Sequence, residues 1–185
     1  MTDATARTGA VGPGAGPASG PGSSAGFLVS QLGFAISRRF GKVLEPLGLE
    51  PRQFALLRYV AAAEGHSQQE LGAVLQVPAS RMVALLDEME ERGLLERRPH
   101  PTDRRAKALY LTPGGRTTLT QAMEAAAAFE GEVTAGLSAD ERQKLVSLLQ
   151  RLAANLELTF GVHPGFAAQE REMGPDPPDH GCARP

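Results

Sequence analysis

The sequence has little cysteine, no long apolar run and no excess of basic charge. Of its 185 residues only Cys182 is a cysteine, so an internal disulfide is excluded. No run of residues is long and apolar enough to span a bilayer, and the N-terminus lacks the apolar core of a signal peptide. We therefore expect a cytoplasmic protein that does not interact with membranes.

The charge is also unlike that of a typical nucleic-acid-binding protein. The formal net charge is −2 and the pI is about 6.1, so a basic charge over the whole chain is lacking. The charge is uneven, however, because the segment from Arg97 to Lys107 holds five arginines or lysines and only one acid, Asp103. A local basic patch can bind phosphate while the rest of the chain stays acidic.

Residue patterns typical of enzymes are missing as well. The chain shows no Ser-His-Asp ordering and no phosphate-cradling glycine motif. Cys182 has only Arg184 as a nearby cation, which is weak support for a redox-sensing thiolate. The four histidines are far apart and lack the spacing of metal ligands: His66, His100, His163 and His180. We expect no catalytic residue, no metal and no cofactor, and therefore no enzyme.

The composition predicts one folded domain between two tails. Residues 1–26 are rich in Gly, Ala and Pro, and residues 161–185 are dominated by Pro, Gly and charge, so both ends are predicted to be disordered. Between them, apolar residues recur at three- and four-residue steps, as in amphipathic helices. The fold class that follows is mainly α.

Capping residues and helix breakers place the helices. The first helix covers 27–44, and the second opens at Pro51. A third, over 68–75, starts at the capping box Ser67–Glu70 and should bury Leu71, Val74 and Leu75. Another ends at Gly93, and two long helices follow the caps Thr112 and Ser138.

Residues 68–111 predict a helix-turn-helix followed by a small β wing. Two short helices are joined closely through residues 76–78, and the second has an apolar stripe of Met82, Leu85, Leu86 and Met89. A hairpin with a basic tip follows, with its return strand over 106–111. In such a unit the N-terminal end of the second helix enters the major groove of DNA.

The residues expected to contact DNA lie at that helix end and in the wing. Ser80 can meet a base edge or a phosphate, and Arg81 can form two hydrogen bonds to guanine; the alternative is a solvated first turn. Asp103 is expected to orient Arg105 for the minor groove, whose negative potential favours arginine. The predicted DNA-binding residues are Ala79, Ser80, Arg81, Arg97, Arg98, Arg104, Arg105 and Lys107, of which Arg97, Arg98, Arg104 and Lys107 suit phosphates.

The apolar helices at both ends of the domain need a further partner. A winged lobe over 51–112 cannot cover the first helix and the leucine stripe of the last one: Leu145, Leu148, Leu149, Leu152 and Leu156. We therefore expect residues 27–47 and 113–160 to form a homodimerisation layer.

The sequence resembles the MarR (multiple-antibiotic-resistance regulator) family of transcription factors over residues 75–83, 86–98, 103–105 and 109–115. The Asp103-Arg104-Arg105 wing followed by a strand and Leu-Thr-x-x-Gly at 111–115 is the most specific part. The resemblance covers 27–160. It implies a homodimer that binds a pseudo-palindromic operator on double-stranded DNA, usually as a repressor released by a small phenolic or anionic ligand. The sequence departs from the family pattern at Glu50 and Pro78, where hydroxyl caps are common.

The family geometry also implies a ligand cleft between the dimer helices and the DNA-binding lobe. Candidate lining residues are Phe34, Arg38, Phe54 and Tyr59, which would suit a small aromatic acid. The alternative is that the aromatic residues are ordinary core and Arg38 is a surface charge. A second function also stays open, a winged-helix dimer whose wing binds an acidic protein, although the basic tip favours DNA.

Overall fold

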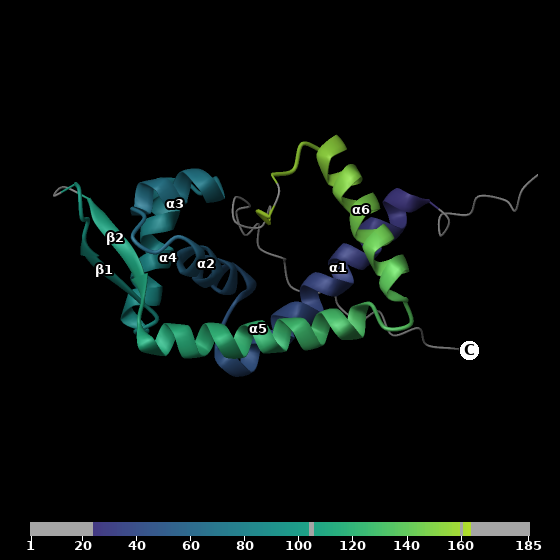
Figure 1. Cartoon of the computed structure of the whole chain (residues 1–185), viewed down its shortest axis with the longest axis horizontal. Coiled ribbons are helices and arrows are strands. Elements are labelled where there is room, and N and C mark those ends of the chain that lie inside the picture. The colour runs from purple at the N-terminus through teal and green to yellow at the C-terminus, as the bar shows by residue number, and fades with distance from the viewer. Residues whose placement is uncertain (1–23, 104–105, 160, 164–185) are drawn as a thin grey trace, which may run out of the picture. The chain divides into compact units, whose positions relative to one another are not determined.

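The computed structural model describes residues 24–103, 106–159 and 161–163. Within these ranges the chain forms helices and one two-stranded antiparallel sheet, so the predicted fold class, mainly α with a β wing, is confirmed. No helix among these residues is long and apolar enough to cross a membrane. The elements in chain order are α1 (Ala25–Leu44), η2 (Glu45–Leu47), α2 (Pro51–Ala62), α3 (Gln68–Leu75), α4 (Ala79–Glu91), β1 (Leu95–Pro99), β2 (Lys107–Leu111), α5 (Pro113–Val133) and α6 (Ala139–Asn155) (Figure 1).

The chain divides into two compact units, with the boundary inside α1 between Arg38 and Arg39. The described part of the first unit is the N-terminal portion of α1, where Phe27, Leu32 and Phe34 are exposed. The second unit holds the rest of the chain, including the main hydrophobic core.

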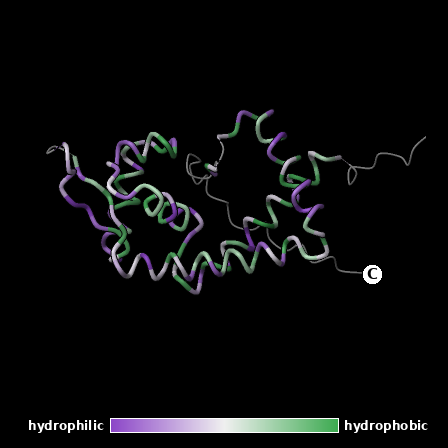
Figure 2. The backbone as a smooth tube through the Cα atoms, in the orientation of Figure 1, coloured by the Kyte–Doolittle hydropathy of each residue, from purple (hydrophilic) through white to green (hydrophobic). Residues whose placement is uncertain are grey.

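The core of the second unit is built around one face of α4. Met82, Leu86 and Met89 are almost completely buried, and Leu85 packs against the core from the side, as the stripe predicted. They pack in one cluster with residues of α2, α3 and β2, and hydrophobic and hydrophilic residues alternate along these helices (Figure 2). The opposite face and the N-terminal end of α4 are left for polar contacts.

One predicted core position is wrong. Val74 is 55% exposed, whereas Leu71 and Leu75 are buried. Successive helix residues are turned by about 100°, so residues 71 and 75 lie about 40° apart along one line of the helix, while residue 74 lies about 100° from residue 75 on its flank. Because α3 has only eight residues, this single line faces the core.

The predicted helix starts are confirmed by their hydrogen bonds. The Ser67 hydroxyl accepts from the amide of Glu70 at 3.2 Å, and the Glu70 carboxylate accepts from the amide of Ser67 at 2.7 Å. Ser138 and Glu141 form the same reciprocal pair at α6. These caps satisfy amides that have no partner within the helix.

The wing extends beyond the two strands. In the hairpin, Leu95 pairs with Leu111 and Pro99 with Lys107. The loop before α3 pairs with β2 through two backbone hydrogen bonds. Gly65 donates to the Leu109 carbonyl and Leu109 donates to the His66 carbonyl, both at 3.0 Å. The wing is thereby attached to the first helix of the helix-turn-helix as well as to α4.

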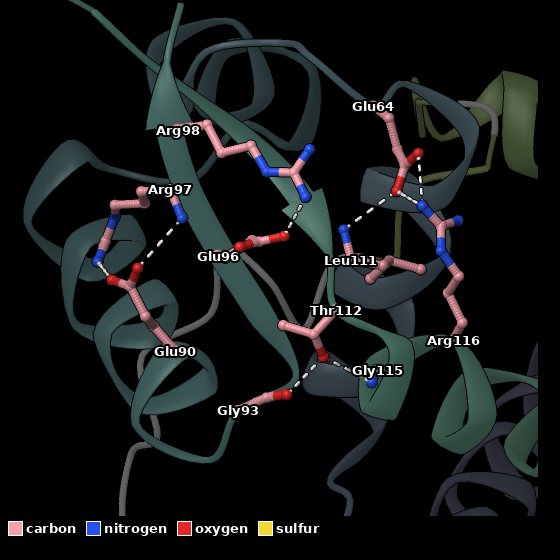
Figure 3. Close-up of polar contacts among 10 residues, drawn as sticks. All are labelled: Glu64, Glu90, Gly93, Glu96, Arg97, Arg98, Leu111, Thr112, Gly115 and Arg116. Atoms are coloured by element: carbon pink, nitrogen blue, oxygen red, sulfur yellow. Dashed lines mark hydrogen bonds and ion pairs between the residues drawn. The ribbon is translucent and has the colours of Figure 1, made fainter.

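The base of the wing is held by two polar junctions (Figure 3). The Thr112 hydroxyl donates to the Gly93 carbonyl at 2.5 Å and accepts from the Gly115 amide at 2.9 Å. Glu64 accepts from the Leu111 amide at 3.1 Å and from the Arg116 guanidinium at 2.6 Å. The hydrogen bond from Arg116 holds the pKa of Glu64 below its usual value.

Gly115 is required by a close backbone approach. A Cβ at this position would lie 1.9 Å from the Leu94 carbonyl oxygen, whereas a Cβ on Gly114 would make only ordinary contact, 3.5 Å from the Gly93 carbonyl oxygen. We expect Gly115→Ala to lower the free energy of unfolding by roughly 1–3 kcal/mol or more. Gly114→Ala, the matched control, should change it by less than about 1 kcal/mol. Urea unfolding measures both, and equal values for the two variants would contradict this close approach.

The Glu64 junction should make stability depend on pH. A carboxylate whose pKa is lowered by folding stabilises the native state above its unfolded pKa, and this contribution is lost as pH falls through the folded pKa. We therefore expect Glu64→Gln to lower the melting temperature at pH 7. The difference from the unchanged chain should shrink as pH falls below about 4.5, the ordinary value for this group. Thermal melts between pH 3 and pH 7 test this, and a difference independent of pH would contradict it.

Candidate nucleic-acid interface

The N-terminal end of α4 carries the predicted base-reading residues. Pro78 precedes the helix and gives it no side-chain cap. Ala79 and Ser80 are exposed, and Arg81 is partly exposed. Uncapped amides and the helix dipole make this end positive, which favours a negatively charged group such as a phosphate. The structure thus brings these three residues together at one end of the helix.

The turn of the wing is organised by His100, a histidine that shows no metal-ligand spacing in the sequence. The His100 Nδ1 accepts a hydrogen bond from the Asp103 amide at 3.2 Å, and the His100 amide donates to the Ala106 carbonyl at 3.2 Å. An imidazole two residues before a Thr-Asp pair is the signal that could have indicated this role. Arg104 and Arg105 lie outside the described residues, so the expected pairing of Asp103 with Arg105 stays a prediction.

Two of the predicted phosphate ligands already have carboxylate partners. Arg97 forms ion pairs with Asp87, at 2.6 Å, and with Glu90, both on α4, and its side chain is only 20% exposed. Arg98 pairs with Glu96, and its guanidinium carbon lies 4.6 Å from the centre of the Tyr110 ring. In Figure 3 the Arg97 side chain points toward Glu90 on the neighbouring helix. Arg97 therefore ties β1 to α4, and Arg98 lies along the wing.

A groove of about 1160 Å³ separates the wing from the helix-turn-helix. Pro78 and Ala79 line one side, and His100, Asp103 and Lys107 line the other. Glu70 also lines this groove. Its pKa is lowered by the hydrogen bonds from Ser67, so it stays charged in its cap. The groove therefore runs from the start of α4 to the exposed Lys107 of the wing.

Comparison with known proteins agrees with this arrangement. The sequence profile of the MarR family matches residues 47–106. The chain is 33% identical over 135 residues to a protein described as a transcriptional regulator for the hcr operon of Thauera aromatica, covering 69% of this chain and 81% of that protein. The chain belongs to the MarR family.

Solved structures of MarR-family proteins show the same fold. The repressor CouR bound to a 23-mer DNA duplex superposes with a TM-score of 0.65 and 33% identity, over 71% of this chain and 94% of that one. CouR from Rhodococcus jostii RHA1 bound to p-coumaroyl-CoA superposes with a TM-score of 0.62 and 32% identity, over 72% of this chain and 94% of that one. This MarR-family chain is accordingly a transcriptional regulator.

The predicted ligand residues fall into two pairs. In the first unit, the Arg38 guanidinium carbon lies 5.7 Å from the centre of the Phe34 ring. In the second, Phe54 is a buried core residue in edge contact with Phe40. Because the two pairs belong to different units, their joint lining of a cleft stays a prediction.

Tyr59, the fourth ligand candidate, binds the segment after α6. Its hydroxyl donates to the Gly161 carbonyl, and the Gln76 side chain donates to the Thr159 hydroxyl at 3.0 Å. Val162 packs against the core. The predicted boundary at residue 160 thus falls inside a packed segment. The tails expected over 1–26 and 161–185 lie mostly outside the described residues.

Proposed function

We propose that this MarR-family regulator binds a pseudo-palindromic operator as a homodimer, and that it acts as a repressor released by an aromatic acid or its thioester. The observation that carries the proposal is the groove between the start of α4 and the wing. A positive helix end with small or hydrogen-bonding side chains can enter a major groove while the wing meets the neighbouring backbone. CouR, which has this fold and 33% identity, is a repressor bound to DNA.

The homodimer is supported by the surface of α6. No residue of this helix is buried in the single chain. Apolar residues around the helix are each at least 40% exposed: Leu145, Val146, Leu148, Leu149, Leu152 and Leu156. Soluble monomers rarely expose so many neighbouring apolar side chains, and a two-fold partner would cover them.

The proposed DNA contacts divide into reading and positioning. We assign Ser80 and Arg81 to bases, with Ala79 allowing close approach. Arg104 and Lys107 are assigned to the phosphate backbone and Arg105 to the minor groove. Arg97 and Arg98 can add phosphate contacts only if they give up part of their present pairing with Glu90 and Glu96.

Binding assays should distinguish residues that contact bases from residues that contact the phosphate backbone. Arg81→Ala should cost roughly 1–3 kcal/mol per half-site and relax base preference at one position. Lys107→Ala should weaken selected and random duplexes alike and lower the salt slope by about one unit per protomer. Fluorescence anisotropy at several salt concentrations measures both, with a duplex selected by the protein from a random pool.

Arg97→Ala serves as the comparison, because its guanidinium is engaged by two carboxylates. It should lower thermal stability and change the salt slope less than Lys107→Ala does. Footprints should cover two half-sites about 34 Å apart. If a single half-site were bound by a monomer, or if no duplex were selected, the proposal would fail, and the protein-interaction function would become the better account.

The effector proposal rests on Phe34, Arg38, Phe54 and Tyr59 and on the p-coumaroyl-CoA bound by CouR. A ligand releases DNA only if it binds the non-binding conformation more tightly than the binding one. We expect p-coumaroyl-CoA or salicylate to loosen the DNA complex below millimolar concentration, and Arg38→Ala to weaken that effect. Competition titrations measure it. If neither compound acts, the effector class is wrong while DNA binding stands.

A further inference from the structure

A buried amide joins the recognition helix α4 to the start of α2. Gln53 lies in the first turn of α2 and is 1% exposed. Its Oε1 accepts from the Glu50 amide at 2.9 Å and from the Arg92 guanidinium at 3.1 Å. Its Nε2 donates to the Glu88 carboxylate at 2.5 Å. One side chain of α2 therefore binds two residues at the C-terminal end of α4.

Arg92 extends this connection to the linker between α1 and α2. Its second terminal nitrogen donates to the Gly48 carbonyl at 2.7 Å. Gly48 has a φ of +63°, in the left-handed region, and so directs that carbonyl without the strain another residue would have. We name Gln53, Glu88 and Arg92 the polar clamp.

The polar clamp adds directional contacts, which the apolar face of α4 lacks. Burial of Met82, Leu86 and Met89 holds α4 against the core, but apolar attraction has no preferred direction. Hydrogen bonds to a buried amide weaken steeply when their geometry changes, and an unpaired buried donor is penalised. The clamp therefore opposes rotation and sliding of α4 relative to α2.

Small errors at the clamp become large at the DNA-reading end. Arg81 precedes Glu88 by seven residues, which is roughly 10 Å along the helix axis. A tilt of roughly 10° about the clamp would therefore move the start of α4 by roughly 2 Å. Such a displacement is enough to break bidentate contacts with a base edge.

We propose that Gln53 is a positioning residue that, through Glu88 and Arg92, fixes the orientation of α4 and so sets the preference for operator over random DNA. The proposal rests on the DNA-binding function proposed above. Gln53 touches no DNA in this scheme, and its effect reaches the bases only through the helix that it holds.

The test is an exchange of the two hydrogen-bonding groups. Gln53→Glu places two carboxylates against each other with no donor between them. Adding Glu88→Gln restores a donor, because the new amide can donate to the new carboxylate while Arg92 and the Glu50 amide still bind it. Glu88→Gln alone leaves an amide that can accept from Gln53. The exchange thus distinguishes the effect of the hydrogen bond between residues 53 and 88 from the effect of changing either side chain alone.

At pH 8 we expect Gln53→Glu to weaken binding to the selected duplex at least tenfold and to a random duplex less than twofold. Glu88→Gln alone should stay within about threefold of the unchanged chain. The double variant should return to within about threefold, since interacting residues are non-additive. Melting temperatures are measured in parallel.

Two further variants keep the test decisive. If Gln53→Glu does not fold, Arg92→Lys replaces it. One ammonium cannot reproduce the fork that binds Gln53 and Gly48 together, so binding to the selected duplex should fall at least threefold. Arg52→Gln is the matched control. It removes an exposed ion pair with Glu50 in the same turn of α2 and should change neither affinity.

The outcomes separate this proposal from the one on which it rests. If the unchanged chain selects no duplex from a random pool, DNA binding itself is wrong. If it does, three results overturn the clamp: a folded Gln53→Glu chain that keeps its affinity, equal losses on selected and random DNA, or a double variant that stays weak.

Discussion

The burial of one face of α4 organises the second unit. Met82, Leu86 and Met89 are at most 1% exposed, so the direction of this helix is set by what packs around it. Its N-terminal end is consequently turned away from the core with Ala79 and Ser80 exposed. An amphipathic helix with a short polar start can therefore bury its apolar face in the core and expose its N-terminal residues to a ligand at the same time.

Fewer basic side chains of the wing are available to bind phosphate than the sequence suggests. Counting from Arg97 to Lys107 gives five basic residues, but Arg97 is paired with Asp87 and Glu90 and Arg98 with Glu96. Arg97 therefore ties β1 to α4 and Arg98 lies along the wing, so among the described residues Lys107 is the lysine or arginine that lines the groove. A chain of net charge −2 can still present a positive surface, because acids elsewhere neutralise structural arginines.

Local signals explain why most of the fold could be predicted. Caps at Ser67, Thr112 and Ser138 act over three or four residues, so their hydrogen bonds follow from sequence spacing. The pairing of Arg97 depends on how β1 packs against α4, and the exposure of Val74 depends on which line of α3 faces the core. Neither follows from residue spacing alone. The Gln53 contacts were missed because its partners Glu88 and Arg92 lie 35 and 39 residues away. The His100 turn, by contrast, is local and carried a sequence signal in the Thr-Asp pair that follows it.

Both elements that flank the DNA-binding lobe are attached at the same end of α4. The linker after α1 reaches it through Gly48 and Arg92, and the start of α5 reaches it through Thr112 and Gly93. Gly115 brings that start directly onto the Leu94 backbone. Packed interfaces of this kind shift between discrete arrangements and do not deform continuously. A displacement of α5 or of the linker would therefore act on the C-terminal end of α4, and the length of the helix would carry it to Ser80 and Arg81.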